Sequence, residues 1–203
     1  MKEEKQLVLF FSRGTEVDST NLAAKLKNKF DELGDPAVIP FNPNNPNQPL
    51  IIFNHGLINL TVGISDISFI YNSENHKKYY DTVMDIIECF EDLDYSFERL
   101  GYISTLIHTK KEKEKFIENV FKDTSMVSSE FQFSWYTKEL IDSVSVNVWE
   151  REMTDIMNNI ELVSVFDINT PMNEVYNISS EFVRDFIKQC DKYIDSKDKK
   201  YKK

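Results

Sequence analysis

The residue types that most often carry catalysis or bind metals are few in this sequence and lie far apart. The three histidines, His55, His76 and His108, each fall in a different predicted turn or element end. A zinc site needs ligands at close spacing or on rigid neighbouring elements, and none of these histidines has such spacing. We therefore expect ordinary turn and surface histidines.

The sequence also lacks the common catalytic signatures. It contains no G-x-G-x-x-G, no phosphate-binding loop with its lysine, no H-E-x-x-H and no G-x-S-x-G. Each of these motifs positions a nucleotide, a metal or a nucleophile in a defined local structure. We accordingly predict no catalytic residue, no metal site and no cofactor, and the sequence favours a non-catalytic protein over an enzyme.

Both cysteines, Cys89 and Cys190, fall on the apolar stripes of predicted helices. A buried cysteine behaves as a small hydrophobic residue. Glu88 and Glu91 lie close to Cys89 in the sequence and would raise the pKa of its thiol, which argues against a nucleophile. Two thiols without metal-ligand spacing also favour a reducing compartment.

A run of aromatic and charged residues is the best candidate for a binding surface. Trp149 and Tyr136 both fall in the polar register of predicted strands, and charged residues follow Trp149 directly. An aromatic pair on a solvent-facing sheet could anchor a partner, although coverage by the rest of the protein is the more common outcome. Likewise, charges at a hairpin end are most often simply solvated. The predicted partner-binding residues are Tyr136, Trp149, Glu150, Arg151, Glu152 and Asp155.

Composition limits the classes of partner. The chain has 203 residues and a net charge of −10, and 41% of its residues are hydrophobic. An acidic surface is repelled by phosphate backbones and by anionic lipid, so we expect neither direct nucleic-acid binding nor membrane binding. The charged stretch Met1–Gln6 leads straight into a predicted strand. We expect no signal peptide and a cytoplasmic protein.

The stretch from Ile58 to Leu93 shows most clearly how the elements are built. Apolar residues alternate with polar ones along two segments, which predicts two half-buried antiparallel strands. From Val83 onward the apolar residues recur at helical spacing, so we expect a helix packed on the apolar face of that hairpin. A similar order returns between Val144 and Ile194.

The whole chain is predicted to be an α+β protein whose helices pack on one face of antiparallel sheet. Each half gives a strand, a helix, three or four antiparallel strands and a long helix; the predicted halves are residues 1–97 and 98–195, packed as one globular unit, with a disordered basic tail at 196–203. This order is similar to the two repeats of a TATA-box-binding-protein-like fold. The likeness is one of predicted topology and implies no function, and the negative charge argues against a saddle on DNA.

Three functional hypotheses follow. The first is an acidic interaction protein, of the kind that a phage or mobile element encodes, that binds another protein through its charged surface or the loop Asn42–Pro49 and could inhibit a machine that handles nucleic acid. The second is a small-molecule-binding or enzymatic domain with a pocket between sheet and helix. The third is a subunit that buries its outer sheet face in a larger assembly. We favour the first.

Overall fold

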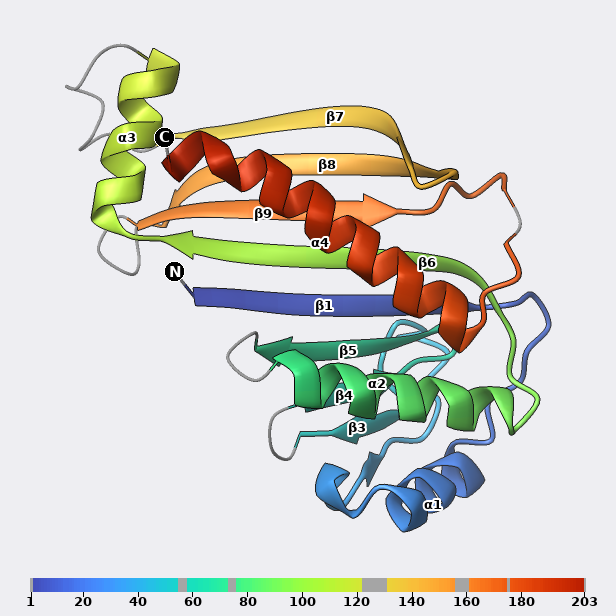
Figure 1. Cartoon of the computed structure of the whole chain (residues 1–203). Coiled ribbons are helices and arrows are strands. Elements are labelled where there is room, and N and C mark those ends of the chain that lie inside the picture. The colour runs from blue at the N-terminus through green and yellow to red at the C-terminus, as the bar shows by residue number, and fades with distance from the viewer. Residues whose placement is uncertain are drawn as a thin grey trace.

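The protein forms one continuous antiparallel sheet of nine strands, in the order β2-β3-β4-β5-β1-β6-β9-β8-β7 (Figure 1). The computed structural model describes residues 2–54, 58–72, 76–121, 131–155, 161–174 and 176–202. Two central strands, β1 and β6, pair directly and so join the N-terminal and C-terminal halves. The α+β class and the antiparallel sheet are therefore as predicted.

Along the chain, single strands and runs of successive strands are separated by helices. The strands are β1 (Lys2–Phe11), β2 (Ala37–Val38), β3 (Ile51–Phe53), β4 (Ile58–Val62), β5 (Asp66–Asn72), β6 (Phe97–His108), β7 (Gln132–Ile141), β8 (Val144–Asp155) and β9 (Glu161–Asn169). The helices are α1 (Ser19–Lys29), the short 3-10 helix η1 (Asp31–Leu33), α2 (His76–Glu91), α3 (Lys110–Phe121) and α4 (Ser180–Lys202).

Helices α2 and α4 lie side by side on the same face of the sheet (Figure 1). On the central strand β1, Leu7, Leu9 and Phe11 point to this face and are buried, whereas the alternate residues Val8 and Phe10 are only half-buried. The period of two thus divides the sheet into a helix-covered face and an open face. The core lies between the helices and the covered face.

The predicted unit from Ile58 to Leu93 is confirmed. It forms β4, β5 and α2, with Leu60 directly opposite Phe69 on the covered face. From α2, Val83, Ile87 and Phe90 are buried in the same core. One apolar face of the hairpin and one stripe of the helix together account for this packing.

Local capping signals in the sequence fix the starts of three helices. The side chain of Asp18 accepts a hydrogen bond from the Asn21 backbone N–H at α1. At α3, the Thr109 backbone N–H donates to Glu112 and the Glu112 backbone N–H donates to the Thr109 hydroxyl, which together form a capping box. The Ser179 hydroxyl accepts from the Phe182 N–H at α4.

Two boundaries differ from the predicted ones. The sequence predicts a strand from Tyr102 to His108, but β6 begins five residues earlier, at Phe97, because Phe97 and Leu100 are buried in the core. Helix α4 continues to Lys202, whereas residues 196–203 were expected to be disordered. The lysines after Ile194 are good helix formers and help the helix continue beyond its apolar stripe. In the part of the chain that the structure describes, no helix is long and apolar enough to span a membrane.

Candidate protein-binding surface

The open face is widest over the strands β6, β9, β8 and β7. Strand register aligns its residues into rows that cross all four strands. One row consists of Ile103, Asp167, Trp149 and Tyr136, which lie directly opposite one another in turn. We call Tyr136, Asn147, Trp149, Arg151, Asp167 and Asn169 the open-face cluster.

An aromatic pair forms the outer part of this cluster. Tyr136 and Trp149 are opposite residues on β7 and β8, and their ring centroids lie 4.7 Å apart with the planes tilted by 46°. The Tyr136 hydroxyl donates a 2.8 Å hydrogen bond to Asn147 Oδ1. Each ring is 45% exposed, so the pair is ordered by its own contacts while presenting apolar surface to solvent. The expectation that the rest of the protein covers these rings is wrong.

A polar group lies beside the rings. Arg151 Nη2 is 3.7 Å from Asp167 Oδ2, and the Asn169 side-chain amide donates to Asp167 Oδ1. Asn169 lies over Gly101 on the neighbouring strand, where an added Cβ would stand 2.4 Å from its Oδ1. A glycine here leaves the space that the Asn169 side chain occupies.

The other three predicted partner-binding residues, Glu150, Glu152 and Asp155, are not part of the open-face cluster. Glu150 and Glu152 alternate with Trp149 and Arg151, so they point to the helix-covered face. Glu150 is half-buried, and Glu152 is completely buried and does not belong to the open surface. Asp155 ends β8, and its side chain lies outside the described residues. Of the six predicted residues, the open-face cluster contains Tyr136, Trp149 and Arg151.

Glu152 instead belongs to a buried polar group formed by three strands. His108 Nε2 lies 2.7 Å from Ser164 Oγ, and the Ser164 hydroxyl donates to Glu152 Oε2. His108 is 1% exposed, so the prediction of a surface histidine is wrong for this residue. Because the Ser164 hydroxyl donates its proton to the Glu152 carboxylate, it accepts a hydrogen bond from the His108 imidazole. In a hydrolase triad the imidazole instead takes the proton of the serine. The arrangement gives hydrogen-bond partners to the buried Ser164 hydroxyl, His108 Nε2 and Glu152 Oε2.

His55 lies outside the described residues, and His76 begins α2 with its side chain outside them. Among the described residues no cluster of histidine, cysteine and carboxylate side chains has the arrangement of a metal site.

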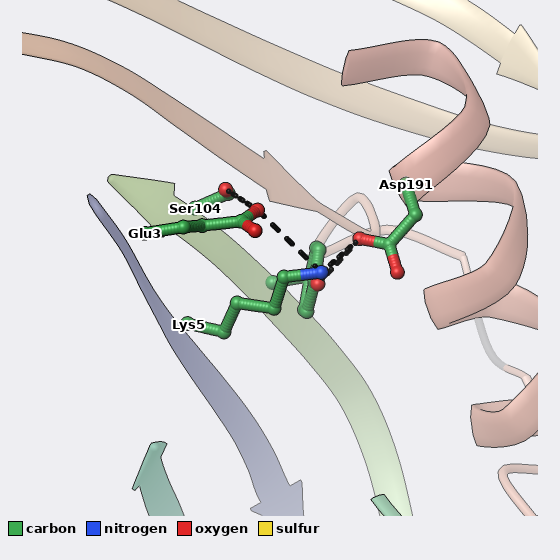
Figure 2. A network of polar contacts seen from close by, with 5 residues as sticks. Glu3, Lys5, Ser104 and Asp191 are labelled. Carbon is green, nitrogen blue, oxygen red and sulfur yellow. Dashed lines mark hydrogen bonds and ion pairs between the residues drawn. The ribbon is translucent and has the colours of Figure 1, made fainter. Parts of the chain in front are cut away.

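A second buried polar group connects the sheet to α4 (Figure 2). Lys5 Nζ lies 2.8 Å from Asp191 Oδ1 and 3.5 Å from Glu3 Oε1, and Ser104 donates to Glu3. The Tyr102 hydroxyl donates a 2.6 Å hydrogen bond to Asp191. Burial raises the pKa of Tyr102 well above its ordinary value, and the Asp191 carboxylate adds to the shift.

Both thiols are buried, as predicted. Cys89 and Cys190 lie on the core-facing sides of α2 and α4, and burial raises the pKa of both. Neither thiol is in the environment of a reactive cysteine, which needs exposure and nearby positive charge.

A shallow hollow of about 360 Å³ lies between the β7–β8 turn and α4. Its lining includes Asp142, Glu181, Asp185, Gln189 and Phe182. Gln189 Nε2 donates to Asp142 Oδ2 across it. The hollow is acidic and open, unlike the mostly apolar, enclosed pockets that bind small molecules.

Comparison with models of known protein families gives no match for this chain, and comparison with curated proteins gives none either.

Proposed function

We propose that the protein binds another protein through the open-face cluster and has no catalytic role. The observation that supports this most is the exposed pair of Tyr136 and Trp149 with Arg151 nearby on one uncovered sheet face. Tryptophan, tyrosine and arginine are the residue types most enriched among binding hot spots.

The polar part of the cluster supports a specific interface. Within the described part of the chain, Arg151 has one ion-pair contact, with Asp167 at 3.7 Å, and its guanidinium has further donors for an acceptor on the partner. Rings flanked by hydrogen-bonding side chains give an interface both buried apolar area and orientation. The cluster itself carries one positive and one negative charge, so contact there does not depend on a strongly charged partner.

The net negative charge of the protein favours a partner with a basic surface. A charge of −10 attracts basic proteins over several ångströms and raises their association rate. A protein that handles nucleic acid has such a basic surface, and an acidic protein bound there would inhibit it. Added salt should therefore slow association while leaving the contacts of Trp149 in place.

Capture of partners from the native host tests the proposal, with variants of two matched tryptophans. Trp149 is 45% exposed on the open face, and Trp135 is 44% exposed on the covered side of the adjacent strand β7. We expect at least one protein to be recovered with the wild type and with Trp135→Ala, and to be lost with Trp149→Ala. Recovery of the same proteins with both variants, or of none with the wild type, would contradict the proposal.

We also infer that the two halves are repeats of one structural unit, as in the TATA-box-binding-protein-like topology. The support is that β1, α1, strands and α2 are followed by β6, α3, strands and α4, and that strand order runs outward from the β1–β6 pair in both directions. Superposition of the halves by a single rotation that matches α2 with α4 would support the repeat. A mismatch of those helices would refute it.

A further inference from the structure

The two edges of the sheet differ sharply. The edge strand β2 has two residues and lies between Pro36 and Pro40, which donate no backbone hydrogen bonds. The opposite edge, β7, has ten residues, pairs with β8 without a register shift and contains no proline. Natural sheets usually shorten, bend or cover their edges to prevent pairing with another chain. The first edge is short and flanked by prolines. Within the described residues, β7 carries only the charges of Lys138 and Glu139 as protection.

Exposed apolar side chains concentrate at this second edge. Leu140 is 72% exposed, and Trp135, Tyr136 and Trp149 are each close to 45% exposed. Three of them lie on β7 and one lies on the neighbouring strand. Such a concentration marks an interaction site.

The β7–β8 turn determines which backbone groups face outward. Asp142 and Ser143 both have positive φ, at 47° and 71°, as in a two-residue type I′ hairpin turn. Ile141 and Val144 flank this turn and form a hydrogen-bonded pair, so the odd-numbered residues of β7 bond to β8. The even-numbered residues direct their N–H and C=O groups to the free edge. These are Gln132, Ser134, Tyr136, Lys138 and Leu140.

We propose that β7 pairs antiparallel with β7 of a second copy of this chain, in the register that places Tyr136 opposite Tyr136. The sheet then continues from one copy into the other across a twofold axis. This assembly is additional to the binding of a partner through the open-face cluster, and it uses the edge of the sheet.

Charge repulsion and the number of paired residues together favour this register. With Tyr136 on the axis, Ser134 lies opposite Lys138 and Gln132 lies opposite Leu140, so all five outward-facing residues are paired with one another. Centring on Lys138 or Glu139 would place like charges directly opposite, which is destabilising. Centring on Thr137 avoids this repulsion but places Gln132 against Asp142 in the turn.

The molecular mass in solution tests the pairing. We expect sedimentation velocity of the wild type to give twice the 23.9 kDa of the chain at high concentration, with a shift toward the single chain on dilution. Ser134→Pro removes one outward N–H without touching the bonds to β8, and should reduce the mass to that of one chain. Ser134→Ala is the matched control and should keep the wild-type mass.

Cysteine cross-linking tests the register with variants that preserve the backbone. Under mild oxidation, Tyr136→Cys should give a disulfide-linked dimer, because the two Cα atoms of an opposing pair lie within disulfide range. Lys138→Cys should cross-link far less. A wild type with the mass of one chain at every concentration, or preferential cross-linking through Lys138→Cys, would overturn the proposal. So would a gain in mass seen only with a different protein, and this result would assign the edge to another occupant.

Discussion

At the scale of single residues, the buried charges are held by partners from distant parts of the chain. Lys5 is 4% exposed, and its ammonium group lies between Glu3 on its own strand and Asp191 on α4. A lysine buried this deeply is tolerated only because these carboxylates compensate for the water it has lost. Asp191 retains some contact with solvent, which stabilises its charge. The charge of Lys5 therefore depends more on Asp191 than the charge of Asp191 depends on Lys5.

Removing Asp191 should therefore destabilise the protein more than removing Lys5. We expect Asp191→Ala to lower the free energy of unfolding by about 3 kcal/mol, since it leaves a buried ammonium with a weaker contact. Lys5→Met fills the same space and should cost only about 1 kcal/mol. Urea denaturation measures both values.

Asp195→Ala is the matched control, because Asp195 lies one turn further along α4 and is exposed. Its effect should stay within about 0.5 kcal/mol of zero. A loss for Asp191→Ala no larger than that of the control would show that the ion pair does not fasten α4 to the sheet.

At the scale of elements, α4 is attached to the rest of the molecule at its N-terminus. The Glu91 carboxylate, at the end of α2, accepts a 2.7 Å hydrogen bond from the Ser180 backbone N–H. This bond satisfies one of the free N–H groups of the first turn and places a negative charge at the positive end of the helix dipole. The two helices that cover the sheet are thus connected directly.

We predict that Glu91→Ala lowers the free energy of unfolding by about 1 kcal/mol, the usual cost of losing an N-terminal cap. Glu91→Gln keeps an acceptor without the charge and should cost less. Glu88→Ala, an exposed glutamate on the same helix, is the control. Denaturation midpoints compare the three, and equal effects of Glu91→Ala and Glu88→Ala would count against a capping role.

The elements themselves could be predicted from sequence because their causes are local. Alternation of apolar and polar residues predicts β4 and β5, and residues that can cap a helix, such as Asp18 and Thr109, stand at helix starts. The candidate site is harder to predict, because the run from Trp149 to Glu152 looks like one group of aromatic and charged residues, although neighbouring residues of a strand face opposite sides. Applying the period of two to that run would have separated Glu152 from Trp149.

Contacts between segments that are distant in the chain leave no comparable pattern in the sequence. Neither the Lys5–Asp191 pair nor the His108–Ser164 contact follows from any spacing in the chain, because both depend on how strands are ordered in the sheet. The only hint was Lys5 itself, which falls in the same alternating register as the buried Leu7 and Leu9. An inward-facing lysine indicates a buried partner without identifying it.

At the scale of the whole molecule, the described strands form a single sheet with α2 and α4 on one side. Figure 1 shows α2 and α4 over that side, and the open-face cluster lies on the other. The proposed partner binding and the proposed pairing through β7 both depend on this asymmetry, since one uses the open face and the other the free edge beside it. Helices on both faces would have covered Trp149.

The most direct measurement of this asymmetry compares two adjacent residues of β6. Ser104 is fully buried beneath the helices, and Thr105 is half-buried on the open face. We predict that a thiol reagent labels Thr105→Cys rapidly in the native protein, and labels Ser104→Cys no faster than the buried cysteines of the wild type. Equal protection of both positions would show that the second face is covered, and would contradict the account.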